Sequence, residues 1–464
     1  VMRGLTNIEG IYFLGIGGIG MSALARYFLS QGYIICGYDR TQSPLTDRLE
    51  EEGCSITYED NIDSLPVLFS EPSENYRVLI VYTPAIPKDN VLLNFFTNNG
   101  YTIYKRAEIL GVISRDTDAI AVAGTHGKTT VSTMTAHILS SSPVDCSAFL
   151  GGISRNYETN LLLSESRFTV MEADEFDRSF LHLSPLISVV TAIDPDHLDI
   201  YGNAESMIEA YSEFCQRVRP GGSLIINESI GCSLSLPGDA TIYTYGTGEK
   251  SSFRATDIRK EEGCYTFDII TPGEPVRDIR LHLPGMVNIL NATAAASAAW
   301  CAGVSPEFIR SALGSYQGVV RRFDIRYSGN EIIYVDDYAH HPQEINALVS
   351  AVRDFWPGRH VTGIFQPHLY TRTRDFAEGF ADALDKLDEV LLLTLYPARE
   401  KPIEGVSSDM IAALMKNRNV KVVTREELLP ALVNVKKGLL LTIGAGDIDR
   451  FIEPITEMLK EKNA

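Results

Sequence analysis

The sequence is poor in positive charge. Its 464 residues include 41 lysines and arginines against 60 aspartates and glutamates, which gives a formal net charge of −19. Nucleic acids and anionic membrane surfaces are bound by surplus lysine and arginine, so this balance argues against both as partners. Any anionic substrate must therefore meet positive charge that is concentrated locally.

Paired cysteines and long uninterrupted apolar runs are also lacking. The seven cysteines are odd in number and form no Cys-x-x-Cys pair, which disfavours a disulfide framework or a zinc site and predicts a reducing, cytoplasmic compartment. The apolar stretch 11–29 is interrupted by four glycines and by Arg26, which argues against export or membrane insertion. With 45% hydrophobic and 22% charged residues, the chain is expected to be globular and soluble, with about three domains.

A glycine-rich loop stands between a predicted strand and a predicted helix. The apolar run 119–123 indicates the strand and residues 131–139 the helix, which together give the turn and helix N-terminus that cradle a triphosphate. Lys128 would place a charge at the β/γ-phosphates, and the Thr129 hydroxyl could bind Mg²⁺. The loop departs from the common spacing, since Val122 replaces a glycine. An ordinary turn is the alternative, but it leaves the lysine without a purpose. The predicted loop residues are Gly124, Thr125, His126, Gly127, Lys128, Thr129 and Thr130.

The first hundred residues carry a second glycine motif. A predicted strand runs into Gly-Ile-Gly-Gly-Ile-Gly, and the next predicted strand, 33–38, ends in Asp39, nineteen residues after Gly20. This pattern is typical of dinucleotide binding, with pyrophosphate over a helix N-terminus and the aspartate on a ribose. An NAD-dependent enzyme is one interpretation. A dehydrogenase has no use for the triphosphate loop, however, and the same geometry would serve a UDP-sugar. A third strand, predicted at 78–82, ends in a polar turn of Thr83, Pro84 and Ala85.

Carboxylates follow two predicted strands of the central region. Carboxylates beside a phosphate loop are the usual ligands of Mg²⁺, and Glu172 is the first candidate. His197 could bind a second metal ion, although a structural histidine is the alternative. Asn288 and Asn291 lie one helical turn apart and could read an adenine edge or cap the helix. The carboxylates concerned are Glu172, Asp174, Glu175, Asp194, Asp196 and Asp199.

Polar clusters also follow the predicted strands of a third region, which begins near Tyr316. Strands alternating with helical segments imply another mostly parallel sheet. Arg372 and Arg374 lie two apart, so in an extended segment both would point one way and could hold a carboxylate or a phosphoryl group. A solvated charged face is the alternative, and the neighbouring His368 and Tyr370 favour a site. The predicted strands are 331–335, 360–365, 389–395 and 438–443.

Taken together, these motifs resemble the Mur ligases. The matching segments are Gly-Ile-Gly-Gly-Ile-Gly-Met-Ser, Gly-Thr-His-Gly-Lys-Thr-Thr, Glu-Ala-Asp-Glu, Asp-His-Leu-Asp, Pro-Gly-x-x-Asn-x-x-Asn-Ala, Arg-Arg-Phe, Asp-Asp-Tyr-Ala-His-His-Pro and Gln-Pro-His-x-Tyr-Thr-Arg-Thr. They occur in the family's order over essentially the whole chain. The resemblance implies an α/β fold with an N-terminal Rossmann-like domain for the UDP-substrate, a central P-loop ATPase-like domain with a mostly parallel sheet, and a C-terminal Rossmann-like domain that closes on ATP and the amino acid. The implied boundaries are 1–107, 108–315 and 316–464.

The resemblance further implies an activity in peptidoglycan precursor synthesis. ATP, with Mg²⁺, would phosphorylate the lactyl carboxylate of UDP-N-acetylmuramate, and the amine of L-alanine would displace phosphate from the acyl phosphate through a tetrahedral intermediate. A second Mg²⁺ is implied, and the partners are these small molecules, with no nucleic acid and no membrane. The N-terminal glycine motif would then hold UDP.

The resemblance also assigns site residues by role. The catalytic residues would be Lys128, Glu172, His197, Arg322, His340 and Arg372. Besides the phosphate loop, ATP would contact Asn288, Asn291, Arg321, Arg322, Asp337 and Tyr338. The UDP-sugar would contact Gly15, Gly17, Gly18, Ile19, Gly20, Met21, Ser22, Asp39, Thr83, Pro84, Ala85, Arg106 and Glu108. The amino acid would contact His340, His368 and Arg372, and the metal ligands would be Thr129, Glu172 and His197.

Two departures from the family pattern and three rival functions stay open. Val287 stands where many members have histidine near adenine, and Leu369 stands where many have arginine near the amino acid. One rival is a ligase that adds a tripeptide to the same sugar nucleotide in cell-wall recycling. The others are an NAD-dependent oxidoreductase with a vestigial phosphate loop and a nucleotide-gated binding module without catalysis.

Overall fold

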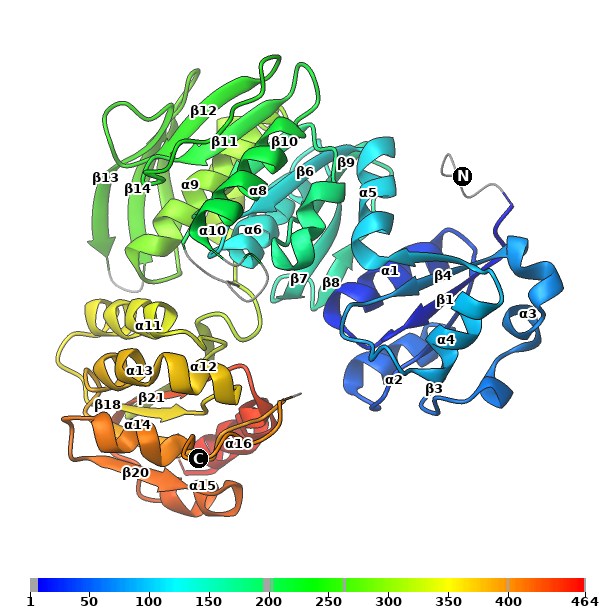
Figure 1. Ribbon diagram of the computed structural model, residues 1–464. Helices are drawn as coiled ribbons and strands as arrows, with labels where there is room; N and C mark the ends of the chain where they lie inside the picture. Colours follow the sequence, from blue (N-terminus) through cyan, green and yellow to red (C-terminus); the bar gives the residue numbers. More distant parts are fainter. Residues whose placement is uncertain (1–6, 195–200, 202, 262–263, 399, 463–464) are drawn as a thin grey trace. The chain divides into compact units, whose positions relative to one another are not determined.

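The computed structural model describes residues 7–194, 201, 203–261, 264–398 and 400–462. It divides into two compact units. The first comprises Val1–Arg259, Thr266–Arg280 and Leu290–Tyr316, and the second comprises Lys260–Tyr265, Leu281–Ile289 and Gln317–Ala464. Both are built from sheets flanked by helices (Figure 1). The predicted α/β class with mostly parallel sheets is confirmed, while the predicted boundaries at 107/108 and 315/316 stay predictions.

A five-stranded parallel sheet opens the first unit, in the order β3-β2-β1-β4-β5. All residues of the central strand β1 are buried, as expected for a parallel strand that is covered on both faces. The strands are β1 Gly10–Leu14, β2 Ile34–Tyr38, β3 Ser55–Thr57, β4 Val78–Tyr82 and β5 Thr102–Lys105. The helices are α1 Ile19–Ser30, α2 Pro44–Glu51, α3 Val67–Ser70 and α4 Val91–Asn98, with 3₁₀ turns η1 Ile62–Ser64 and η2 Pro72–Arg77.

The ten-stranded sheet has the order β15-β14-β13-β12-β11-β10-β6-β9-β7-β8. Its middle pairs are parallel, and β7 and β8 form an antiparallel edge. The strands are β6 Asp118–Ala123, β7 Ser147–Ser154, β8 Thr159–Leu162, β9 Phe168–Glu172, β10 Ile187–Val190, β11 Ser223–Asn227, β12 Thr241–Gly246, β13 Phe253–Glu261, β14 Cys264–Ile270 and β15 Val276–Leu281. The helices are α5 Arg106–Asp116, α6 Lys128–Ser140, η3 Phe176–His182, α8 Ala204–Gln216, α9 Met286–Cys301 and α10 Pro306–Ser315.

The sheet of the second unit has six strands in the order β16-β17-β21-β18-β19-β20, with β16 antiparallel to the rest. Helices α11, α13 and α14 supply the core on one face, and α15 and α16 supply it on the other. The strands are β16 Asp324–Ser328, β17 Ile332–Asp337, β18 Val361–Phe365, β19 Glu389–Leu393, β20 Val420–Val423 and β21 Gly438–Ile443. The helices are α11 Pro342–Phe355, α12 Tyr370–Asp375, α13 Ala377–Leu384, α14 Ser408–Leu414, α15 Arg425–Leu432, η4 Asp447–Phe451 and α16 Ile452–Lys462.

Two expectations from composition can be compared with the structure. All seven cysteines are unpaired thiols, which agrees with the absence of a disulfide framework. Within the part of the chain that the structure describes, no helix has the length and apolar character needed to cross a membrane.

Candidate active site

The phosphate loop lies between β6 and α6 and depends on two glycines in left-handed conformations. Gly124 has a φ of +135° and Gly127 a φ of +81°. A Cβ on Gly124 would lie 2.0 Å from Thr191 Oγ1, and one on Gly127 would lie 2.9 Å from Asn291 Oδ1. Glycine is therefore required at both positions. Because α6 begins directly afterwards, at Lys128, the N-terminal amides of the helix lie at the loop, where an anion is favoured.

The Lys128 ammonium is held in an ion pair that the sequence did not predict. Its Nζ donates to Gly124 O at 2.8 Å and to the two carboxylate oxygens of Glu175 at 2.8 and 2.7 Å. The Glu175 side chain is only 1% exposed. Burial alone would lower the pKa of Lys128, but the surrounding carboxylates, Glu175 above all, outweigh it and raise the pKa. The side chain is therefore charged, as its predicted contact with phosphate requires.

Two predicted metal ligands lie side by side. Thr129 Oγ1 donates to Glu172 Oε2 at 3.0 Å, which joins the first turn of α6 to the carboxyl end of β9. Gly151 in β7 makes room for this carboxylate, since a Cβ there would lie 2.0 Å from Glu172 Oε2. The glycine is a site feature that the sequence reasoning missed. The result is a small group of oxygen donors next to the phosphate loop.

The remaining residues of the loop face the end of β10. Thr125 Oγ1 accepts from Asp194 N at 3.1 Å, and His126 Nε2 lies 3.6 Å from Asp194 Oδ2. Thr130 lies in the first turn of α6. His197 lies outside the described residues. Among those that are described, no three or more His, Cys, Asp or Glu side chains are grouped so that they could hold a metal ion.

The two asparagines at the start of α9 differ in role. Asn288 Nδ2 donates to Pro284 O at 2.7 Å, so its amide is used within the turn that starts the helix. Asn291 instead lies beside the phosphate loop, close to Gly127. Val287, at the position of the first departure from the family pattern, is 47% exposed. Of the two amides, that of Asn291 is therefore the one placed next to the predicted nucleotide site.

The N-terminal glycine loop is closed by side chains from other elements. Gly17 N donates to Asp39 Oδ2 at 2.8 Å, which places the aspartate after β2 against the loop. A Cβ on Gly20 would lie 2.2 Å from Arg106 Nη1, so the first residue of α5 reaches the start of α1. The structure thus places an acidic and a basic residue, both predicted to contact the UDP-sugar, beside different glycines of the same loop.

Other residues predicted for this site serve the local packing. Gly15 has a φ of +85°, and a Cβ there would lie 2.6 Å from Thr83 Cγ2. Met21 and Ser22 are buried, with their amides bonded within the start of α1. Glu108 accepts from the backbone N–H that precedes α5, at 2.6 Å, and so caps that helix. The turn after β4 and the start of α1 hold the rest: Gly18, Ile19, Pro84 and Ala85.

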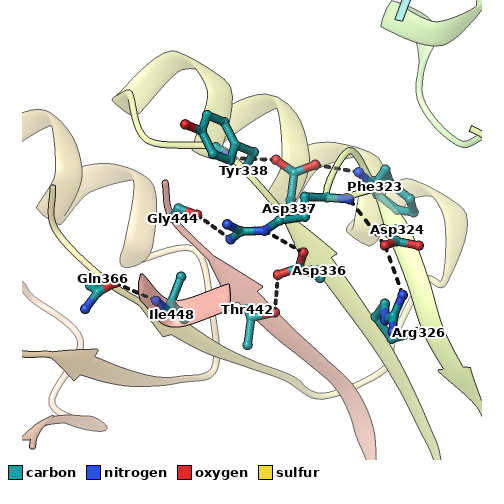
Figure 2. Close-up of polar contacts among 12 residues, drawn as sticks. Phe323, Asp324, Arg326, Asp336, Asp337, Tyr338, Gln366, Thr442, Gly444 and Ile448 are labelled. Carbon is teal, nitrogen blue, oxygen red and sulfur yellow. Dashed lines mark hydrogen bonds and ion pairs between the residues drawn. The ribbon is translucent and has the colours of Figure 1, made fainter. Parts of the chain in front are cut away.

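In the second unit, Arg321 is tied to the carboxyl ends of two strands. Its Nε donates to Asp336 Oδ2 at 3.1 Å and its Nη2 to Gly444 O at 2.6 Å. Asp336 is fully buried and also accepts from Thr442 Oγ1 at 2.6 Å (Figure 2). The guanidinium that was predicted to contact ATP is therefore already engaged within the fold.

Asp337 and Tyr338 lie at the end of β17. The carboxylate of Asp337 accepts from Phe323 N at 2.7 Å (Figure 2). It also accepts from Ala339 N at 2.8 Å. Burial raises the pKa of Asp337 to about 6, although these bonds oppose the shift. The guanidinium carbon of Arg322 lies 5.1 Å from the centroid of the Tyr338 ring, within range of a cation–π contact. Arg322 and Tyr338 thus form a paired surface at this edge of the sheet.

The residues predicted to hold the amino acid come together. His340 Nδ1 lies 3.0 Å from Tyr338 O and 3.5 Å from the Glu344 carboxylate, so this nitrogen is the donor and Nε2 is the acceptor. Burial lowers the pKa of His340 more than Glu344 raises it. The His340 and His368 rings are 6.4 Å apart, and Arg372 Nη1 lies 3.5 Å from His368 Nδ1. Glu344 was not predicted as part of this site.

The paired arginines require a correction. Arg372 and Arg374 were predicted to point one way along an extended segment, but they lie in helix α12 (Tyr370–Asp375). Residues two apart on a helix point to nearly opposite sides. Arg374 is half exposed and donates to Asp375 at 2.7 Å, whereas Arg372 lies beside His368. The helix follows a sharp turn at Leu369, whose φ of +70° is strained for leucine.

Comparison with known proteins identifies the family of this chain. Three family models match in succession: "Mur ligase family, catalytic domain" over 10–117, "Mur ligase middle domain" over 122–299 and "Mur ligase, glutamate ligase domain" over 321–446. The UDP-N-acetylmuramate–L-alanine ligase of Cytophaga hutchinsonii is 46% identical over 463 residues, 99% of this chain and 98% of the relative. The enzyme of that name from Parabacteroides distasonis is 47% identical over 456 residues, 98% of each chain.

A solved structure gives the same result in three dimensions. The crystal structure of the UDP-N-acetylmuramate-alanine ligase of Thermotoga maritima superposes with a TM-score of 0.82 at 26% identity. The match covers 98% of this chain and 99% of the other. With three successive family domains and full-length relatives, the chain belongs to the Mur ligase family.

Proposed function

We propose that this protein joins L-alanine to the lactyl carboxylate of UDP-N-acetylmuramate at the expense of ATP, in the synthesis of peptidoglycan precursors. The observation that carries the proposal is the near-half identity, over the full length, to relatives that bear the name of this activity. The phosphate loop, the amino-terminal glycine loop and the cluster around Arg372 support the proposal, because they are candidate sites for its three substrates. The unpaired thiols suit a reducing cytoplasm, where we place the reaction.

The chemistry proceeds in two transfers. In the first, a lactyl carboxylate oxygen attacks the γ-phosphorus of ATP, the new O–P bond forms, and ADP leaves. In the second, the neutral amine of L-alanine attacks the acyl carbon, and a tetrahedral intermediate forms. The C–O bond to phosphate then breaks, the C–N bond remains, and the nitrogen loses a proton. The protein forms no covalent bond with substrate, so its task is to position reactants and offset charge.

We assign stabilisation of the negative charge on the transferred phosphoryl group to the phosphate loop. Lys128 and the amides at the start of α6 would face the β/γ-phosphates of bound ATP, where fixed positive charge stabilises a transition state. Arg322 is the further basic group that we assign to phosphate. Arg321 is assigned to the framework instead, since its guanidinium binds Asp336 and Gly444.

The incoming amino acid is assigned to the second unit. Arg372 would pair with its carboxylate, because a guanidinium matches the planar geometry of that group. His340 is neutral near pH 7, as burial lowers its pKa. Since its Nδ1 lies 3.0 Å from Tyr338 O, its Nε2 is the nitrogen that could accept the proton lost by the amine.

Magnesium fits the donor set beside the phosphate loop. Thr129 Oγ1 and Glu172 Oε2 are hard oxygen donors, and Gly151 leaves the carboxylate room to approach. When bound there, Mg²⁺ would neutralise charge on the phosphates. His197, outside the described residues, is proposed as ligand of a second ion.

A phosphate-release assay tests this function against its rivals. ATP and Mg²⁺ are supplied with UDP-N-acetylmuramate and, in separate reactions, with L-alanine, glycine, L-serine or a cell-wall tripeptide. We expect release that requires both the sugar nucleotide and L-alanine. Preference for the tripeptide would identify a recycling ligase instead, and absence of release together with NAD binding would favour an oxidoreductase.

A further inference from the structure

The ion pair between Lys128 and Glu175 saturates the ammonium group that the phosphate loop presents. An ammonium has three N–H donors. In this structure they meet three acceptors at normal hydrogen-bond distances, which are Gly124 O and the two carboxylate oxygens of Glu175. An incoming phosphate oxygen therefore has to take a donor from one of these partners.

Complete separation of the pair would be costly. The side chains of Lys128 and Glu175 are 14% and 1% exposed, so neither can exchange its partner freely for water. A buried carboxylate that loses its counter-charge is strongly destabilising. The arrangement that avoids this cost has the ammonium shared, with one donor kept on Glu175 and one given to phosphate. The carboxylate then both holds the lysine in place and competes with the phosphate for it.

The backbone of Glu175 is anchored as well. Tyr201 Oη donates to Glu175 O at 2.6 Å in a buried bond. Tyr201 lies four residues after His197 in the sequence, at the far end of the segment that carries this proposed metal ligand. Glu175 thus connects the phosphate loop, through Lys128, with the end of that segment. By contrast, Asp177 nearby is 39% exposed and pairs with Lys105 at 2.6 Å, away from the loop.

We propose that Glu175 is a positioning residue, which fixes the Lys128 ammonium for phosphoryl transfer and limits nucleotide affinity by competing with phosphate for it. This rests on the proposed role of Lys128 as the phosphate ligand. Glu175 contacts no reacting atom in this account. It acts entirely through Lys128.

Glu175→Gln tests the proposal, because the amide keeps the shape of the side chain and removes its charge. ADP affinity is measured by calorimetry, and kcat and KM for ATP by phosphate release. Without a competing negative charge beside the lysine, we expect the Kd for ADP to fall about tenfold, since nearby charges interact strongly in a partly buried site. We expect kcat to fall by about tenfold as well, because the ammonium is less well fixed. A purely structural role would weaken binding and turnover together.

Two further variants keep the test decisive. Glu175→Asp retains the competing charge, so its Kd for ADP should stay within about threefold of the wild-type value. This variant is also the one to measure if Glu175→Gln does not fold. Asp177→Asn is the matched control in the same segment and should leave ADP binding unchanged. Unchanged or weaker ADP binding by folded Glu175→Gln would overturn the proposal, as would tighter binding by Glu175→Asp equal to that of Glu175→Gln. ADP binding needs no amino acid, so these outcomes are independent of whether L-alanine is the substrate.

Discussion

Replacing Gly151 with alanine should impair the use of Mg²⁺ without unfolding the protein. The added Cβ would lie 2.0 Å from Glu172 Oε2 and 2.7 Å from Cδ of the same carboxylate. Other heavy atoms essentially never lie closer than 3.0 Å to a Cβ. The distance from Glu172 Oε2 to the new Cβ must therefore grow from 2.0 Å to at least 3.0 Å, a shift of about 1 Å. That movement disturbs the contact of 3.0 Å between Glu172 Oε2 and Thr129 Oγ1.

The size of the effect follows from this displacement. A misplacement of about 1 Å at a reacting centre costs about 10²-fold, and disturbed support of a metal ligand costs about 10–100-fold in affinity. We therefore expect the Mg²⁺ concentration for half-maximal activity to rise about 10–100-fold. Gly151 is exposed and has no left-handed φ, so the free energy of unfolding should change by no more than about 0.5 kcal/mol.

The assay is phosphate release as a function of Mg²⁺ at saturating ATP, UDP-N-acetylmuramate and L-alanine, with thermal unfolding measured in parallel. Gly238→Ala is the matched control, since a Cβ at Gly238 meets nothing within 4 Å. An unchanged Mg²⁺ requirement in folded Gly151→Ala would refute the assignment of Glu172 as a metal ligand.

Three further outcomes are expected from phosphate release and, for the first of them, from calorimetry as well. Lys128→Ala should abolish turnover but leave UDP-N-acetylmuramate binding, measured by calorimetry, largely intact; an equal loss of both would contradict separate nucleotide sites. Arg372→Ala should raise the KM for L-alanine more than that for ATP, whereas Arg374→Ala, which removes an exposed side chain, should change neither; the reverse order would move Arg372 out of the amino-acid site. Burial lowers the pKa of His340, and the reaction needs both this ring and the amine of L-alanine neutral, so kcat/KM for L-alanine should fall about tenfold per pH unit as the free amine is protonated, and more steeply only below pH 6.5, where His340 is protonated as well. Arg372→Ala should move this steeper fall to higher pH, since the guanidinium also lowers the pKa of His340. A steeper fall that begins above pH 6.5 in the wild type would contradict this role of His340.

The strands and their polar ends could be predicted from the sequence. Buried parallel strands appear as continuous apolar runs, and glycine or carboxylate clusters mark where they end. For this reason the phosphate loop after β6, Glu172 at the end of β9 and the aspartates at the end of β17 were placed correctly along the chain. These features depend on local sequence alone.

Side-chain partners across elements could not be predicted in the same way. Glu175 follows β9 as one carboxylate among three, and spacing alone does not show that it points at Lys128. The left-handed turn at Leu369 that starts α12 has no signal in a leucine. The position of Glu344 does have a signal in the sequence. A glutamate three residues after His341, with proline between them, is typical of the capped start of a helix.

The most direct test of the acyl-phosphate route uses UDP-N-acetylmuramate labelled with ¹⁸O in both oxygens of the lactyl carboxylate. The wild-type protein is incubated with this substrate, ATP, Mg²⁺ and L-alanine, and the released phosphate is analysed by mass spectrometry. If the carboxylate oxygen attacks the γ-phosphorus and later leaves with it, the phosphate will carry one ¹⁸O and the sugar-nucleotide product will keep the other in its new amide. Product formed together with unlabelled phosphate would contradict the mechanism.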